Sequence, residues 1–143
     1  MHLGTAWIAE GQTGHDAAWQ LLAQMYRQQT GKEMPEAVRT PLGKPYFPNS
    51  DWNFSLTHTK SRVFCVLSNR PVGIDAEEQN RNINLALADK ILSPEERAAF
   101  DRAADPRRAL LTFWVLKEAQ KKWMQTRKGD EDSTWVRRGA MTK

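Results

Sequence analysis

Apolar residues recur along the chain at spacings that predict its first strands and helix. Residues 3–9 form a short apolar stretch typical of a strand. Residues 16–29 carry apolar side chains at the spacing of one helical face. Residues 62–68 are apolar on both alternating faces, which indicates a central strand. Residues 72–77 are a second strand candidate, and the intervening turn at residues 69–71 predicts a hairpin.

The second half of the chain carries two helix start signals. Ser93 and Glu96 have the spacing of a capping box, with a proline at the first helical position between them. Asp105, again followed by proline, predicts a helix running to about Arg127. Gly129 is the expected stop. The second half is therefore predicted to be mostly helical.

Length and composition limit the class of protein to which the chain can belong. The chain has 143 residues, which favours one domain, and its single cysteine, Cys65, cannot form an intrachain disulfide. A lone cysteine in an apolar strand is expected in the core of a protein from a reducing compartment. The first residues lack the basic flank and apolar stretch of a signal peptide, and no apolar run reaches membrane-spanning length. We expect a cytoplasmic protein without membrane association.

Positive charge is concentrated at the end of the chain. From Lys117 onward there are eight basic and four acidic residues, so this segment carries the same net charge as the whole chain, +4. Such an excess suits phosphates, nucleic acid or an acidic protein as partner. A solvated helix face is the alternative interpretation.

Two acids lie at the end of a predicted strand, in the segment 73–77, which reads Gly-Ile-Asp-Ala-Glu. Asp75 and Glu77 share one face because side chains alternate along a strand. Two carboxylates roughly 7 Å apart on one face can converge on one hard cation, and Gly73 leaves room beside them. A solvated strand end with two acids is the alternative.

A third acid lies on the predicted long helix. Trp114, Glu118 and Lys122 are four residues apart and form one stripe. The alternative is an ordinary surface ion pair, but the neighbouring aromatics Phe113 and Trp114 indicate a partly buried helix, in which an unpaired acid is costly. Three carboxylates, completed by phosphate oxygens and water, suit Mg²⁺ and a metal-assisted phosphoryl-type transfer.

These residues resemble a known family. Segments 73–77 and 114–122, the latter reading Trp-x-x-Lys-Glu-Ala-x-x-Lys, resemble the paired signature of the 4′-phosphopantetheinyl transferases. Upstream, segments 43–47 (Gly-Lys-Pro-Tyr-Phe) and 54–59 (Phe-Ser-Leu-Thr-His-Thr) resemble two further segments of that family, in the same order. The resemblance covers roughly residues 40–128 and is closer to the two-lobed, monomeric type than to the small trimeric type.

The resemblance implies a fold, a domain organisation and an activity. The fold would be α+β, with a small antiparallel sheet packed against a long helix and an incomplete second lobe. Residues 1–143 would form a single domain, with an N-terminal lobe over 1–70 and a shortened C-terminal lobe over 71–143. The activity would be that of a holo-[acyl-carrier-protein] synthase, which moves the 4′-phosphopantetheine group of coenzyme A onto a serine of an apo acyl or peptidyl carrier protein. Such carriers serve fatty acid or polyketide biosynthesis, and adenosine 3′,5′-bisphosphate is the second product.

The resemblance also implies catalytic roles. Asp75, Glu77 and Glu118 would hold Mg²⁺ against the pyrophosphate of coenzyme A. Glu118 would also help to deprotonate the acceptor serine, and Lys122 would contact the phosphates and stabilise the departing bisphosphate. Trp114 is assigned to packing.

Coenzyme A contacts are implied for three upstream residues. Lys44 and His58 would bind its 3′-phosphate, and Thr57 replaces the serine that the family has before the histidine, keeping the hydroxyl. The alternatives are a solvated loop lysine at position 44 and a satisfied core or hairpin histidine at position 58.

Partners follow from the same comparison. Carrier proteins present acidic helices near their serine, which suits the basic C-terminal half. Two other functions stay open: a degenerate family member that binds coenzyme A or carrier protein without turnover, and a basic nucleic-acid-binding module. The second is disfavoured because the chain has no nucleic-acid motif.

The short C-terminal lobe predicts self-association. Relatives continue through further strands after the position of Gly129, whereas the segment around Trp135 and Val136 could supply one strand at most. An unpaired sheet edge and an uncovered apolar helix face favour association of copies. We expect the interface near the sheet edge or near these two residues.

Overall fold

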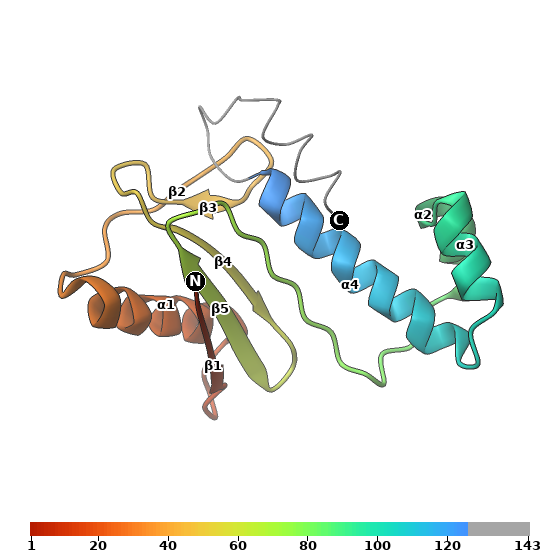
Figure 1. Cartoon of the computed structure of the whole chain (residues 1–143). Helices are drawn as coiled ribbons and strands as arrows, with labels where there is room; N and C mark the ends of the chain where they lie inside the picture. The colour runs from red at the N-terminus through yellow and green to blue at the C-terminus, as the bar shows by residue number, and fades with distance from the viewer. Residues whose placement is uncertain (126–143) are drawn as a thin grey trace.

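The computed structural model describes residues 1–125 (Figure 1). Among these residues, no helix combines the length and the apolar character needed to cross a membrane. The elements are β1 (His2–Trp7), α1 (Gly14–Thr30), β2 (Val38–Arg39), β3 (Pro45–Tyr46), β4 (Asn53–His58), β5 (Arg62–Ser68), a 3₁₀ turn η1 (Leu85–Leu87), α2 (Ala88–Ile91), α3 (Pro94–Asp101) and α4 (Pro106–Met124).

Three strands form the main sheet, in the order β1-β5-β4 with antiparallel neighbours. β5 is the central strand, as its apolar pattern predicted. Its hairpin partner is β4, which pairs from Asn53 opposite Ser68 to His58 opposite Val63. β2 and β3 form a separate two-stranded ribbon.

The predicted hairpin between residues 62–68 and 72–77 is wrong. Both edges of β5 are occupied, one by β1 and the other by β4, so no edge is left for residues 72–77. Between β5 and η1, residues 69–84 contain no strand. The pair Asp75 and Glu77 therefore lies on an irregular segment.

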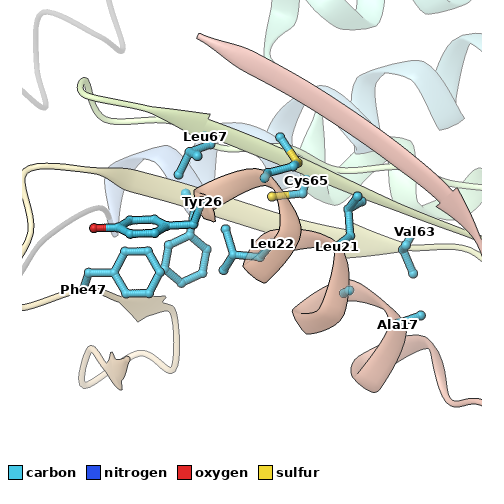
Figure 2. Close-up of a cluster of buried hydrophobic side chains, with 11 residues drawn as sticks. Ala17, Leu21, Leu22, Tyr26, Phe47, Val63, Cys65 and Leu67 are labelled. Atoms are coloured by element: carbon cyan, nitrogen blue, oxygen red, sulfur yellow. The ribbon is translucent and has the colours of Figure 1, made fainter. Parts of the chain in front are cut away.

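Helix α1 covers one face of the sheet and encloses the larger apolar core. Figure 2 shows Leu22, Phe47 and Cys65 meeting there, and Leu22 and Cys65 are 0% exposed. Thr13 caps the helix by accepting a hydrogen bond from the Asp16 backbone N–H, and Gly31 ends it in the left-handed conformation. Burial raises the pKa of the Cys65 thiol to about 12, as expected of a cysteine that serves as core packing.

A second apolar cluster joins α4 to η1, α2 and α3. Its buried members lie between Ile83 and Leu111, whereas those of the first cluster lie between Ala17 and Leu67. The division of one domain into lobes at residue 70 stays a prediction. The α+β class with a small antiparallel sheet is confirmed, and the helix that packs across the sheet face is α1.

Both predicted helix starts in this half are confirmed. Ser93 and Glu96 exchange the two hydrogen bonds of a capping box. The side chain of Asp105 accepts a hydrogen bond from the Arg108 backbone N–H at the start of α4. α4 ends at Met124, and the predicted stop at Gly129 lies outside the described residues.

The irregular segment 69–84 runs between the sheet and α4 (Figure 1). The Ile74 backbone N–H donates to Ser55 Oγ at 3.2 Å, which fixes the segment to β4. On its other side, a Cβ atom at Gly73 would stand 2.2 Å from the Ala119 carbonyl oxygen and 2.5 Å from the Trp123 backbone nitrogen. Only glycine therefore allows the segment to lie this close to α4.

Replacing Gly73 with alanine should separate the segment from α4. Because the obstructing atoms belong to helix backbone, which cannot rotate away, we expect a loss of about 2–3 kcal/mol in the free energy of unfolding, measured by urea denaturation. Gly11→Ala is the control: Gly11 has a positive φ of 78° but nothing within 4 Å of a Cβ, so only backbone strain of about 1 kcal/mol applies. Equal losses in the two variants would show that close approach is not what requires Gly73.

Candidate functional site

A cavity of about 370 Å³ lies where α1, the segment around Lys44, β4 and the end of α4 meet. Five of the residues predicted from sequence line it, although they come from three distant stretches of the chain: Lys44, Thr57, His58, Glu118 and Lys122. Asp75 adjoins this group through its contacts with Thr57 and Lys122. Glu77 lies apart from it and lines two neighbouring hollows instead.

The ammonium of Lys122 connects the elements that form the cavity. It donates hydrogen bonds to the Leu56 carbonyl in β4 at 3.1 Å and to the Ile74 carbonyl at 2.9 Å. It also lies 3.6 Å from Asp75 Oδ1. These contacts hold a cation at the wall of the cavity, beside a carboxylate on the irregular segment.

Asp75 is a largely buried carboxylate in a crowded electrostatic environment. Burial raises its pKa, nearby Lys122 opposes this, and the like charges of Glu77 and Glu118 raise it further. Thr57 Oγ1 lies 3.5 Å from Oδ1 and can donate to it. Within residues 1–125, the other oxygen, Oδ2, is buried and has no hydrogen-bond partner. An unpaired buried oxygen of this kind is costly and would be satisfied by a bound cation.

The three predicted metal ligands each have a basic neighbour. Lys122 lies beside Asp75, Arg81 pairs with Glu77 at 2.5 Å, and Lys121 pairs with Glu118 at 3.1 Å. Across residues 1–125, no three histidine, cysteine, aspartate or glutamate side chains lie close enough together to hold a metal ion as they stand. The oxygen donors suit Mg²⁺ in kind, and the unpartnered Oδ2 of Asp75 offers one of them.

Lys44 is buried, so the alternative of a solvated loop lysine is wrong. Its side chain is buried just before β3 and donates a hydrogen bond from Nζ to the Val72 carbonyl at 2.8 Å. Burial lowers its pKa to about 8, with a smaller effect from the charge of Lys122. In the described part of the chain, no acid lies within ion-pair distance of its ammonium. Such a cation is well placed to receive an anionic ligand.

His58 is exposed at the end of β4, so it is not a core histidine, and the alternative of a hairpin histidine stays open. Its Nδ1 lies 3.2 Å from the Thr59 carbonyl, and its ring packs so close to Gly14 that a Cβ there would stand 2.5 Å from Nδ1. Thr57, one residue earlier, is buried and faces Asp75. Thr57 and His58 therefore both line the cavity, and Thr57 also contacts the carboxylate of Asp75.

The sequence did not single out three residues that line the cavity: His15, Trp19 and Arg39. His15 and Trp19 lie four apart on α1 with ring centroids 6.2 Å apart, a spacing that a search for polar and aromatic pairs on one helical face could have found. Arg39 donates from Nη1 to the Gly43 carbonyl at 2.7 Å. It lies in a stretch without periodic pattern, so no signal marked it.

Among the described residues, the lining of the cavity combines several cations with one acid. Arg39, Lys44, Lys121 and Lys122 contribute positive charge, and Glu118 contributes a carboxylate. Cations lining a hollow attract phosphate groups, and a carboxylate among them can accept a proton from a hydroxyl group. The arrangement can therefore bind a polyphosphate and assist attack on it.

Part of the chain matches a known protein family. Residues 71–134 match the family model described as the 4′-phosphopantetheinyl transferase superfamily. The match includes Asp75, Glu77, Glu118 and Lys122, and its last residues lie beyond the described part of the chain. No curated protein sequence matches the chain.

Replacing Lys44 with methionine should stabilise the unliganded protein. Below pH 8 the lysine is protonated in both the folded and the unfolded states, so burial of its charge opposes folding in full. We expect Lys44→Met to raise the free energy of unfolding at pH 7 by about 1–2 kcal/mol, because the loss of the bond to Val72 offsets part of the gain.

The effect should depend on pH in a defined direction. From about pH 8 toward the ordinary lysine value of 10.5, the unfolded parent binds a proton that the folded parent does not, so the parent gains stability and its difference from the variant shrinks. Lys32→Met, at an exposed lysine, should show neither effect. Urea denaturation at pH 7 and pH 10 measures both. A destabilised Lys44→Met at pH 7 would contradict the interpretation.

Proposed function

We propose that the chain transfers 4′-phosphopantetheine from coenzyme A to a serine of an apo acyl or peptidyl carrier protein, because residues 71–134 match the family model of the 4′-phosphopantetheinyl transferase superfamily. One observation carries the proposal: Glu118 and Lys122 line one cavity together with Lys44 and His58, beside the buried carboxylate of Asp75. The products are the holo-carrier protein and adenosine 3′,5′-bisphosphate.

In this proposal the cations bind the anionic end of coenzyme A. Lys44 and His58 bind its 3′-phosphate, and Thr57 is a further proposed contact to coenzyme A. A phosphate beside Lys44 would compensate the buried charge, which has no acidic partner among residues 1–125. The binding of the ligand would then offset part of the electrostatic cost of folding.

Mg²⁺ is the proposed metal, with Asp75, Glu77 and Glu118 as its oxygen donors. When bound, the ion would neutralise negative charge on the pyrophosphate. Glu118 removes the proton of the acceptor serine, directly or through water, and the serine oxygen forms the new bond to phosphorus. Lys122 stabilises the charge on the departing bisphosphate as the pyrophosphate bond breaks.

The proposed partner is an acidic carrier protein rather than nucleic acid. Lys117, Lys121 and Lys122 give the later turns of α4 a positive charge that suits such a carrier. We further propose a cytoplasmic location and a single domain with lobes over 1–70 and 71–143. Self-association stays a prediction, and Trp135 and Val136 lie outside the described residues.

Mass spectrometry of carrier proteins tests the proposal. Purified chain is incubated with Mg²⁺, coenzyme A and a panel of apo acyl and peptidyl carrier proteins, and each carrier is weighed intact. A mass gain equal to one phosphopantetheine group on the serine supports transfer. Coenzyme A binding without any mass gain would instead support a family member that binds without turnover, and failure to bind coenzyme A would reject both.

Replacing Glu118 with glutamine should nearly abolish transfer. The change keeps the shape of the side chain but removes the charge needed to bind Mg²⁺ and to accept the serine proton, and loss of a general base alone costs roughly 10²–10⁴ in rate. Glu95→Gln, at an exposed acid of α3, is the matched control and should keep the parent rate. Glu118→Gln rates within a few-fold of the parent would mean that Glu118 is not the base.

Replacing His58 with alanine should weaken the binding of coenzyme A but not that of dephospho-coenzyme A. The variant should bind coenzyme A about tenfold more weakly and dephospho-coenzyme A, which lacks the 3′-phosphate, as well as the parent does. The control is His2→Ala, since His2 contacts Trp52 and does not line the cavity. Titration calorimetry measures the affinity of the parent, the variant and the control for both ligands. Equal losses for both substrates would remove His58 from the phosphate site.

A further inference from the structure

The indole ring of Trp114 lies beside two cations at once. The Arg81 guanidinium carbon is 5.6 Å from the ring centroid, and Lys121 Nζ is 6.0 Å from it. Both separations are within the range of cation–π attraction, for which the tryptophan face is the strongest partner among protein side chains. The same side chain packs against the second apolar cluster, and these contacts hold the ring in place.

Each of these cations holds a carboxylate. Arg81 Nη1 donates to Glu77 Oε1 at 2.5 Å, and Lys121 Nζ donates to Glu118 Oε1 at 3.1 Å. The two acids come from different parts of the chain, Glu77 from the irregular segment and Glu118 from α4. One aromatic ring thus links two ion pairs whose acids are both proposed metal ligands.

Glu77 needs such support more than Glu118 does. Glu118 is carried by a helix, whereas Glu77 lies on residues 69–84, where no strand pairing fixes the backbone. Its side chain is about a quarter exposed and would otherwise be free to turn. The contact with Arg81 engages one carboxylate oxygen, Oε1, so the second oxygen can still coordinate a cation. Hydrogen-bonded partners behind a ligand commonly orient it and raise metal affinity.

We propose that Trp114 and Arg81 are positioning residues for metal binding: the ring holds the guanidinium, and the guanidinium orients Glu77 toward the metal. Lys121, which contacts the same ring, extends the arrangement to Glu118. Trp114 therefore acts through Arg81 rather than by packing alone. This inference rests on the proposed function, because it takes Asp75, Glu77 and Glu118 as the Mg²⁺ ligands.

The experiment measures Mg²⁺ affinity rather than turnover. Mg²⁺ is titrated by calorimetry into the full chain saturated with coenzyme A, and coenzyme A is titrated separately in the presence of EDTA. Arg81→Gln and Trp114→Leu should each weaken Mg²⁺ binding about tenfold or more, with metal-free coenzyme A affinity unchanged. Trp114→Phe, which keeps an aromatic face, should recover part of the loss. Because both residues act along one chain of contacts, the double variant should lose little more than either single variant.

Arg97 provides a matched control within the same protein. It pairs with Asp89 and Asp101 and its guanidinium carbon lies 5.5 Å from the Phe100 ring centroid, so it makes the same kinds of contact away from the site. Arg97→Gln should leave Mg²⁺ affinity unchanged.

The remaining outcomes separate this inference from the proposed function. Unchanged or tighter Mg²⁺ binding by Arg81→Gln overturns the inference and leaves the transferase proposal standing. Parallel losses of Mg²⁺ and metal-free coenzyme A affinity also overturn it, since they indicate a general structural role. A parent chain whose coenzyme A complex binds no Mg²⁺ overturns the inference together with the proposed metal site.

Discussion

The ammonium group of Lys122 is the interaction on which the site depends. It donates to carbonyl oxygens of Leu56 in β4 and Ile74 in the irregular segment, and it lies beside Asp75. The lysine itself belongs to α4, so one cation joins three elements that have no continuous backbone pairing with one another. The close approach at Gly73 makes these contacts possible, because any side chain there would meet the backbone of α4. The geometry of the cavity follows from this junction.

Two ionisable side chains of the site, Lys44 and Asp75, lie in surroundings that reduce the stability of the fold when they are charged. Burial lowers the pKa of Lys44 and raises that of Asp75, so both groups are held in surroundings that disfavour their charged forms. Asp75 Oδ2 is also buried without a hydrogen-bond partner among the described residues. Such features are typical of sites that bind charged ligands, where stability is given up for binding. A phosphate and a divalent cation would satisfy these groups together.

The ion pairs around Trp114 involve two of the three proposed metal ligands, Glu77 and Glu118. Like charges at Asp75, Glu77 and Glu118 repel, and each has a basic residue within ion-pair distance. Lys121 and Lys122 also line the cavity, so the cations that accompany the acids are close to where phosphates would bind. Metal and coenzyme binding are therefore expected to be coupled through the same side chains.

The sequence by itself determined the local structure and most candidate residues. The capping box at Ser93 and Glu96, the start of α4 at Asp105 and the central position of β5 all follow from neighbours within a few residues, and the motif around Glu118 marked the region of the site. These signals are local because capping and helical periodicity act over three or four positions. Whether the motif residues bind coenzyme A and Mg²⁺ stays a proposal.

Only the tertiary structure decided which elements meet. The strand predicted at residues 72–77 did not pair with β5 because β1 and β4 occupy both edges of that strand. The same long-range packing buries Lys44, brings Arg39 to the cavity and places Arg81 beside the Trp114 ring. Strand pairing and burial depend on residues far apart in the chain, and the pattern of a short segment contains no information about its distant partner.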